Sequence, residues 1–349
     1  MRLPKHPPRF SKVNVMTQAA RLNVGVLAAG AWGTALAANW AQRHQVCIWA
    51  REPEVVASIN RDHVNHQFLP KISLPADLKA TVDLADLAQS DVLVLATPVA
   101  ALRVTVQALK SMYGARPMPP LVWVCKGFEP QTGLLPHQVV REELGDVPAA
   151  ALSGPSFAQE VARHMPTAVT IGAADLALAE QLADWLYTPN LRLYASGDVV
   201  GVEVGGAVKN VLAIATGICD GLSLGHNARA ALMTRGIAEI GRLCERLGGQ
   251  RETLMGLSGL GDLILTCTGD LSRNRQVGLA LGQGKTLEQT LAALGHVAEG
   301  VGTAREVARL SRELPVDMPI ARAVAAVIAG DLKAQDAVTQ LMSRAQRAE

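Results

Sequence analysis

A single lysine interrupts the most apolar helical stretch of the chain. Lys209 stands in the run Gly205–Asn210, and the surrounding stretch Val199–Leu222 is rich in glycine, alanine and branched aliphatic residues. Burying an ammonium group without a counter-charge is costly, so Lys209 needs an acidic partner or a lowered pKa. Both are properties of catalytic lysines, whereas the structural alternative is a side chain that extends to the surface.

A second cluster of polar residues could bind an anion. Ser272–Arg275 reads Ser-Arg-Asn-Arg and comes directly before a predicted helix at Gln276–Leu281. A hydroxyl, a guanidinium and an amide at the N-terminus of a helix form a suitable site for a doubly charged phosphate ester. The alternative is an ordinary exposed helix cap with solvated arginines.

The sequence Ala28–Gly33 resembles a dinucleotide-binding fingerprint. It follows an apolar run at Val24–Leu27 and opens a helical stretch, but the first of its three glycines is replaced by Ala28. Gly30 would let the backbone approach a pyrophosphate, and Gly33 would let the helix pack on the sheet. If the turn requires a positive φ at Ala28, the Cβ atom costs about 1 kcal/mol. The alternative is a tight strand-to-helix turn without a ligand.

The end of the second predicted strand selects between the two nicotinamide cofactors. An acidic residue there binds the ribose hydroxyls of NAD, whereas an arginine meets the 2′-phosphate of NADP. Here Arg51 is followed by Glu52, so both cofactors fit and Arg51 favours NADP. The alternative is a solvated pair of loop side chains.

The first half of the chain alternates short β-branched runs with helical patterns, which predicts a parallel, doubly wound sheet. Helical crossovers are expected at Gly33–Gln42 and Val99–Lys110. Six strands are predicted at Val24–Leu27, Val46–Trp49, Leu78–Val82, Val92–Ala96, Leu121–Cys125 and Ala149–Leu152. Two more, at Ala168–Ile171 and Leu191–Tyr194, flank a helix at Asp175–Leu186 and should extend the sheet.

Strand-like runs disappear after about residue 197, so the remainder should be helical. We therefore expect a nucleotide-binding domain at residues 22–197 and an all-helical domain at residues 198–349. The active site should lie between them, because ligands of such sheets bind at the carboxyl ends of the strands. Residues 1–21 should be a disordered basic extension, and Met16 is an alternative start.

Composition restricts the class of protein. The chain has 349 residues, about two domains' worth, and a net charge of +2, which argues against a nucleic-acid partner. The apolar stretch Val199–Cys219 carries Glu203, Lys209 and Asn210, so a buried helix is expected rather than a membrane span. Five widely spaced cysteines without a CxxC pair are typical of a reduced, cytoplasmic protein. His63 and His66 have the spacing of metal ligands but lack a third one, so no metal is predicted.

Taken in order along the chain, the motifs resemble the bacterial NAD(P)-dependent glycerol-3-phosphate dehydrogenase family. The matching stretches are Gly30–Ala37, Trp123–Glu129, Ser153–Glu160, Gly201–Asn210, Asn227–Gly236, Gly256–Cys267 and Ser272–Arg275. The resemblance implies a Rossmann domain with an all-α C-terminal domain, a 6-phosphogluconate-dehydrogenase-like α/β fold. It also implies reversible NADH- or NADPH-dependent reduction of dihydroxyacetone phosphate to sn-glycerol 3-phosphate for phospholipid synthesis.

The resemblance also assigns roles to individual residues. Lys209 is the expected general acid and base, and Lys126 should contact both substrate and cofactor. Two lysines near one carbonyl would lower each other's proton affinity. The other expected substrate contacts are Gly154, Ser156, Asp262, Ser272, Arg273 and Asn274. The other expected cofactor contacts are Gly30, Ala31, Trp32, Gly33, Arg51, Ala158, Arg273, Val297 and Glu299.

Two alternative functions stay open at the level of sequence. One is a related two-domain dehydrogenase acting on a hydroxy acid, of the ketopantoate or hydroxyisobutyrate type, against which the Ser272–Arg275 motif argues. The other is a nucleotide sensor that has lost catalysis, for which Ala28 is the only support. The sequence does not determine the oligomeric state, for which a homodimer is one expectation.

Overall fold

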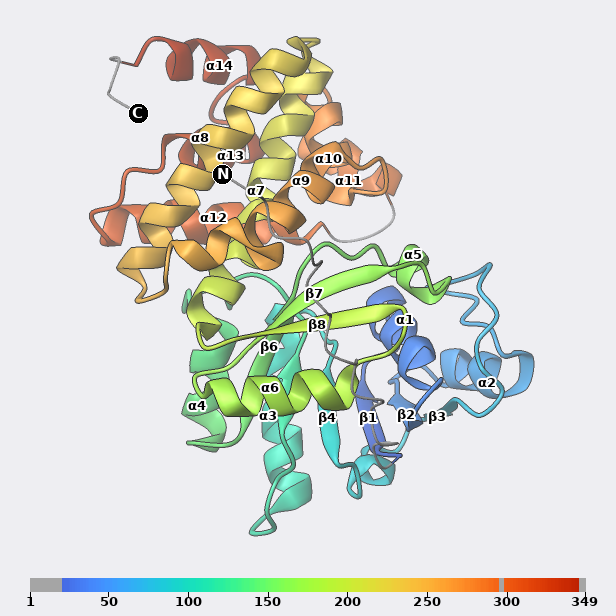
Figure 1. Cartoon of the computed structure of the whole chain (residues 1–349). Helices are drawn as coiled ribbons and strands as arrows, with labels where there is room; N and C mark the ends of the chain where they lie inside the picture. Colours follow the sequence, from blue (N-terminus) through green and yellow to red (C-terminus); the bar gives the residue numbers. More distant parts are fainter. Residues whose placement is uncertain (1–20, 295–297, 345–349) are drawn as a thin grey trace, which may run out of the picture.

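The computed structural model describes residues 21–294 and 298–344, which form a sheet domain below a bundle of helices (Figure 1). The extension expected at residues 1–21, including Met16, lies outside the described residues except for its last position. The strands are β1 (Asn23–Leu27), β2 (Gln45–Trp49), β3 (Lys79–Thr81), β4 (Val92–Leu95), β5 (Leu121–Trp123), β6 (Ala149–Ser153), β7 (Thr167–Gly172) and β8 (Leu191–Ser196). The helices between them are α1 (Ala31–Trp40), α2 (Pro53–Asp62), α3 (Val99–Tyr113), α4 (Pro136–Leu144), α5 (Ala158–Ala162) and α6 (Leu176–Leu186).

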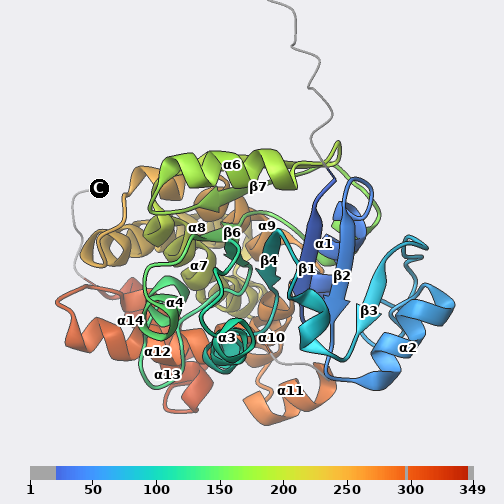
Figure 2. The ribbon, with the colours of Figure 1, turned by 90° about the horizontal axis from the view of Figure 1, so that it is seen from below.

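The eight strands form one sheet in the order β3-β2-β1-β4-β5-β6-β7-β8. Its first six strands are parallel, and the order reverses between β1 and β4, as in a doubly wound Rossmann sheet. Strand β4 shows why both faces are covered: Val92 and Val94 pack with α1, α2 and α6, whereas Leu93 and Leu95 pack with α3 and α4. Figure 2 shows these two layers on opposite sides of the strands.

The last two strands join the sheet as predicted, but β6 and β7 pair antiparallel, whereas the sequence pattern implied a parallel sheet. The connection explains the reversal. Its helix α5 has five residues, about 7.5 Å of length, which is too short to run back along a strand of about 17 Å. Instead α5 packs against α1, and β7 starts at the edge where β6 ended.

The turn after β1 has the backbone conformation that a glycine fingerprint requires. Ala28 has φ +87°, and its N–H donates to the carbonyl of Trp49 at 2.9 Å. A Cβ atom on Gly33 would lie 2.1 Å from the carbonyl oxygen of Ala28, so the helix needs glycine there to approach the strand. Ala28 therefore has the positive φ at which its Cβ atom causes backbone strain.

The helical domain is built around α7 (Val199–Gly221), whose middle is buried on all sides. Its length and composition would suffice to cross a membrane, but 94% of its most apolar window is buried within the chain. The glycines of α7 and α10 let their backbones meet, because a Cβ on Gly217 would lie 2.1 Å from the carbonyl of Arg275. The other helices of this domain are α8 (Gly225–Arg246), α9 (Asp262–Thr268), α10 (Arg273–Gly282), α11 (Leu287–Leu294), α12 (Glu299–Glu313), α13 (Pro319–Ala329) and α14 (Ala334–Met342).

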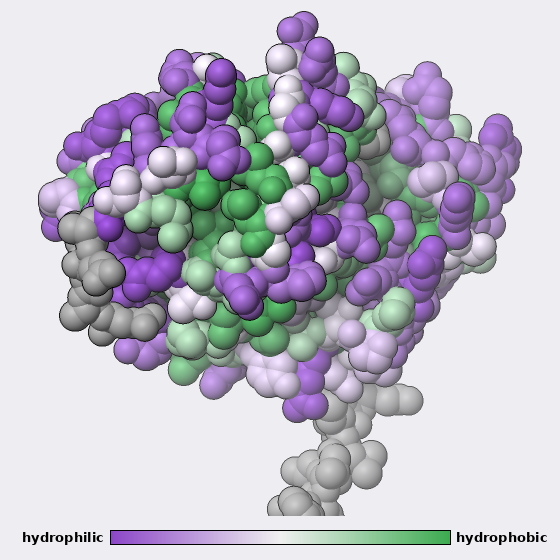
Figure 3. All heavy atoms as spheres, turned by 90° about the horizontal axis from the view of Figure 1, so that it is seen from above, coloured by the Kyte–Doolittle hydropathy of each residue, from purple (hydrophilic) through white to green (hydrophobic). Residues whose placement is uncertain are grey.

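One face of this domain is hollowed and apolar (Figure 3). The hollow has a volume of about 490 Å³ and lies between α7, α8, α13 and α14. Leu232, Val324 and Leu341 contribute to its wall, and Met342 at its edge is 80% exposed.

The strain at Ala28 predicts that Ala28→Gly stabilises the protein. Glycine adopts the positive φ without a Cβ clash, and the gain should be about 1 kcal/mol in the free energy of unfolding after the entropy of the unfolded chain is included. Urea unfolding measures it. The matched control is Ala29→Gly, at a neighbour without positive φ, which should lower stability; a loss in both variants would contradict the prediction.

Candidate active site

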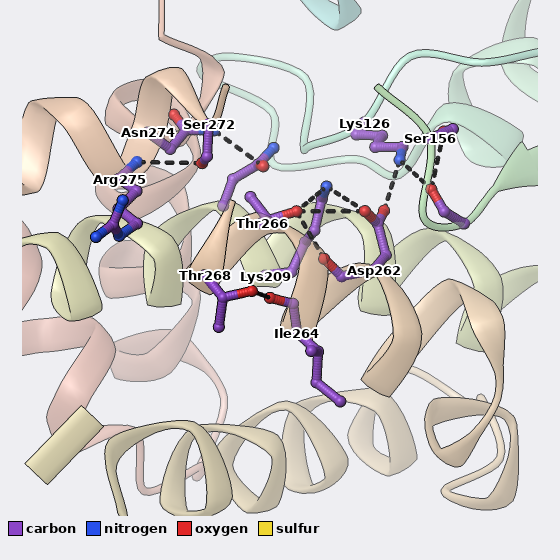
Figure 4. A network of polar contacts seen from close by, with 12 residues as sticks. Lys126, Ser156, Lys209, Asp262, Ile264, Thr266, Thr268, Ser272, Asn274 and Arg275 are labelled. Carbon is purple, nitrogen blue, oxygen red and sulfur yellow. Dashed lines mark hydrogen bonds and ion pairs between the residues drawn. The ribbon is translucent and has the colours of Figure 1, made fainter. Parts of the chain in front are cut away.

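Two lysines from different parts of the chain share one buried carboxylate (Figure 4). Lys209 Nζ lies 2.6 Å from Oδ1 of Asp262, and Lys126 Nζ lies 2.6 Å from Oδ2 of the same residue. The Asp262 side chain is 2% exposed, so it has been removed almost completely from water. The structure therefore brings the expected acid–base lysine together with two of the expected substrate contacts.

Each member of the cluster is positioned by a different element. Lys209 projects from the buried middle of α7, and Asp262 is the first residue of α9. Lys126 follows β5 at the carboxyl edge of the sheet, where ligands of this sheet type bind. The ion pair between Lys126 and Asp262 consequently connects the sheet domain to the helical domain.

Burial and charge set the protonation of Lys209. The pKa of Lys209 is lowered to about 8, mainly by burial; Asp262 opposes this lowering, and the charge of Lys126 adds to it. The direction in which Lys126 acts on Lys209 agrees with the sequence prediction. Burial alone would raise the pKa of Asp262, but the two lysines outweigh it and hold that pKa below its usual value. A lysine with a pKa near 8 can both donate and accept a proton close to neutral pH.

Thr266 completes the surroundings of the Lys209 ammonium and was not identified from the sequence. The ammonium donates to Thr266 Oγ1 at 2.7 Å, and that hydroxyl donates to the carbonyl of Asp262 at 2.6 Å. The available signal was spacing, because residues four apart on one helix share a face. Together, Asp262 and Thr266 fix where the Lys209 nitrogen points.

The loop after β6 lies beside Lys126. Lys126 Nζ approaches the carbonyl oxygen of Gly154 at 3.4 Å, and Ser156 Oγ donates to that oxygen at 2.9 Å. A Cβ atom on Gly154 would lie 2.8 Å from the backbone of Val169, and its φ is +152°. Gly154 is thus required by the close packing of this loop on β7.

The Ser272–Arg275 motif divides into residues with protein partners and one without. Ser272 caps α10 by accepting from the N–H of Arg275, and Arg275 itself pairs with Asp220 at 2.8 Å. Asn274 donates to Asn210 Oδ1 at 3.0 Å and accepts from a backbone N–H of α12. Arg273 is exposed and has no ion pair or hydrogen bond among residues 21–294 and 298–344. Its guanidinium is therefore available to a ligand.

Asn210 is a second residue that sequence reasoning missed. It follows Lys209 on α7, and its side chain orients Asn274 at the start of α10. Asn210 lies within the matching stretch Gly201–Asn210, but the resemblance assigned no role to it. Its position next to a buried lysine was the only sequence signal.

The residues of the fingerprint fit a dinucleotide. A Cβ atom on Gly30 would meet nothing within 4 Å, so protein packing does not require glycine there. A close ligand would, because the N-terminus of α1, which begins with Ala31 and Trp32, favours a pyrophosphate. The turn lies at the same carboxyl edge of the parallel strands as Lys126.

The remaining expected cofactor contacts are dispersed around this edge. Arg51 follows β2, and its side chain is 79% exposed and 3.7 Å from Glu52. Ala158 is the first residue of α5 and Glu299 the first of α12, while Val297 lies outside the described residues. The Glu299 side chain is exposed, but the atoms packed around its carboxyl group raise its pKa. The positive charges of Lys126, Arg273 and Lys209 act in the opposite direction and lower it. That attraction places Glu299 near the cationic cluster.

Comparisons with known proteins match nearly the whole chain. Residues 23–179 match a family model described as NAD-dependent glycerol-3-phosphate dehydrogenase N-terminus, and residues 198–339 match the corresponding C-terminus. A Glycerol-3-phosphate dehydrogenase [NAD(P)+] of Dechloromonas aromatica is 56% identical over 93% of this chain and 98% of its own length. The protein of the same name from Thiobacillus denitrificans is 55% identical over 94% of this chain and 100% of its own.

Solved structures agree in fold. The glycerol-3-phosphate dehydrogenase of Coxiella burnetii is 41% identical, with a TM-score of 0.88, covering 93% of this chain and 99% of that one. A D-mandelate dehydrogenase has a TM-score of 0.61 at 14% identity, which shows a likeness of fold alone.

Proposed function

Because the chain belongs to the NAD-dependent glycerol-3-phosphate dehydrogenase family, we propose that the Lys209–Asp262–Lys126 cluster carries out the proton transfer of that reaction. The chain is an NAD(P)-dependent oxidoreductase that interconverts dihydroxyacetone phosphate and sn-glycerol 3-phosphate. The observation that supports the proposal is the shared carboxylate, which lies 2.6 Å from Nζ of Lys209, a lysine whose pKa burial lowers to about 8. A hydroxy-acid dehydrogenase shares the fold at a lower TM-score, but both family models that match are those of glycerol-3-phosphate dehydrogenase.

The proposed chemistry divides between the cofactor and the protein. The bound nicotinamide supplies the hydride that adds to C2 of the ketone. Lys209 donates its proton to the carbonyl oxygen, which becomes the hydroxyl of glycerol 3-phosphate, and accepts that proton in the reverse direction. Asp262 stays ionised and keeps the ammonium oriented, and Lys126 stabilises negative charge developing on the oxygen.

We propose that the phosphate of the substrate binds at the start of α10. Among the described residues the Arg273 guanidinium has no hydrogen bond or ion pair, Ser272 keeps its hydroxyl hydrogen, and Asn274 has one amide hydrogen left after bonding Asn210. Gly154 and Ser156 are proposed to contact the substrate from the loop after β6. Two lysines and one arginine outnumber Asp262 and Glu299, which leaves a net positive site, as a phosphate ester requires.

The cofactor is proposed to bind along the carboxyl edge of the sheet. Gly30, Ala31, Trp32 and Gly33 would hold the pyrophosphate, and Arg51 would meet the adenosine ribose. Ala158 and Glu299 would contact the cofactor together with Lys126 and Arg273, and Val297, also an expected contact, lies outside the described residues. We accordingly assign residues 22–197 to nucleotide binding and residues 198–349 to substrate binding and proton transfer, with the boundary between β8 and α7.

Removing the Lys209 amine should abolish turnover. Lys209→Ala is expected to reduce kcat for dihydroxyacetone phosphate by about 10²–10⁴-fold. In the wild-type enzyme, ketone reduction needs the protonated amine, so kcat/KM should fall as pH rises through about 8, whereas alcohol oxidation should rise over the same range. Absorbance at 340 nm measures both. Lys285→Ala, at an exposed lysine, is the control; wild-type turnover in a folded Lys209→Ala protein would refute the role.

Shortening the Arg273 fork should weaken substrate binding. Arg273→Lys replaces a bidentate donor by a point charge, and KM for glycerol 3-phosphate should rise roughly 10-fold or more. Arg275→Lys is the matched control, since Arg275 is held by Asp220 and Asp270 and should change stability but not KM. Equal KM values for wild type and Arg273→Lys would exclude Arg273 from the phosphate site.

We further propose a cytoplasmic homodimer. All five cysteines are free, as suits a reducing compartment, and an apolar hollow lies beside α14. A second copy of the chain is the expected occupant, because most soluble oligomers are twofold dimers. Light scattering should give twice the chain mass, and Met342→Glu should shift it toward one chain. A single-chain mass at micromolar concentration would contradict this.

A further inference from the structure

Asn65 lies outside every motif named for the site, yet its side chain donates two hydrogen bonds to the fingerprint turn and the first turn of α1. It stands between α2 and β3 and is 0% exposed. Its Nδ2 donates to the carbonyl of Ala29 at 2.8 Å and to Thr34 Oγ1 at 2.8 Å. Its Oδ1 accepts from the N–H of Phe68 at 3.0 Å. One carboxamide thus connects a separate loop to both ends of the turn.

The two contacts lie where the turn is least able to hold itself. Ala29 is the residue between the strained Ala28 and Gly30, and Thr34 is in the first turn of α1. Thr34 also donates from its hydroxyl to Ala29 at 3.2 Å and from its N–H to Gly30 at 2.9 Å. A strained backbone conformation persists only when the surrounding contacts fix it. Asn65 supplies such contacts from outside the turn, together with the Trp49 carbonyl that accepts from the N–H of Ala28.

We propose that Asn65 is a positioning residue for the dinucleotide: it holds the Ala28–Gly33 turn in the conformation that presents Gly30 and the N-terminus of α1 to the pyrophosphate. This rests on the proposed cofactor site. The carboxamide suits the task because it combines two donors with an acceptor. An aspartate would place lone pairs against the Ala29 carbonyl, and alanine would leave that buried carbonyl with one donor fewer.

A matched control is available nearby. Asn60, on α2, also uses both ends of its carboxamide, donating to the carbonyl of Ala80 at 2.9 Å and accepting from its N–H at 2.8 Å. Those contacts join α2 to β3 and do not reach the turn. Asn60→Ala therefore reproduces the structural loss without the proposed effect on the cofactor.

The first test measures nucleotide binding in the full-length protein. Asn65→Ala should raise the Kd of NADPH and NADH roughly 10-fold, read from quenching of tryptophan fluorescence, the scale expected for loss of a buried hydrogen-bonding group. At saturating nucleotide, KM for dihydroxyacetone phosphate should stay within about twofold, since Asn65 does not touch the substrate site. Asn60→Ala should lower the Tm and leave Kd unchanged. Asn65→Ser, which keeps one donor, gives a smaller rise in Kd if the alanine variant does not fold.

The second test joins Asn65 to the strain at Ala28. In an Ala28→Gly background the turn needs less external support, so Asn65→Ala should raise Kd by less than about threefold. The inference is overturned if Asn65→Ala and Asn65→Ser both leave Kd unchanged. It is also overturned if Asn60→Ala raises Kd as much as Asn65→Ala does, or if Asn65→Ala raises Kd equally with and without Ala28→Gly. Failure of the wild-type protein to bind either nucleotide would instead overturn the proposed cofactor site.

Discussion

The candidate site depends on one carboxylate that two ammonium groups share. Asp262 is buried, so its charge would be unfavourable alone, and the same is true of Lys209. Together with Lys126 the three groups are mutually stabilising, with one positive charge in excess. Burial is the main cause of the lowered pKa of Lys209, and the charge of Lys126 adds to it. The positive excess is the sign of charge that complements a phosphate ester. Lys126 therefore serves both tasks, because its charge favours proton release from Lys209 and attracts the substrate.

That interaction constrains the rest of the fold, because its members are far apart in sequence. Lys126 and Asp262 are brought together only when the carboxyl edge of the sheet meets α9. Helix α7 holds Lys209 in the interior of the helical domain, where its small residues let α10 pack against its backbone. A larger side chain at Gly217 would separate the two helices, and the start of α10 carries the proposed phosphate site. The small residues of α7 thus serve the geometry of the site.

The sequence predicted the architecture well because the architecture follows from local patterns. Each of the eight strands overlaps one that the sequence predicted, and the long helix around Lys209 was correctly expected to be buried. The antiparallel direction of β7 could not be predicted, since it depends on how far a short connection reaches. The positive φ of Ala28 likewise could not be predicted, because it depends on the turn in which the Ala28 N–H donates to the Trp49 carbonyl.

Residues at the site were predictable to the extent that they belong to a contiguous motif. Asn65 does not, and Thr266 lies within Gly256–Cys267 without a role of its own there. The roles of both arise only when separate segments of the chain meet. Even within Ser272–Arg275 the motif does not say which arginine serves the ligand. Side chains two positions apart on a helix are rotated by about 200° around its axis, so Arg273 and Arg275 lie on nearly opposite faces of α10 and have different neighbours. Arg275 finds two aspartates and becomes structural, and Arg273 finds none among the described residues. The acidic side chains on the neighbouring elements thus decide which arginine is left for the substrate.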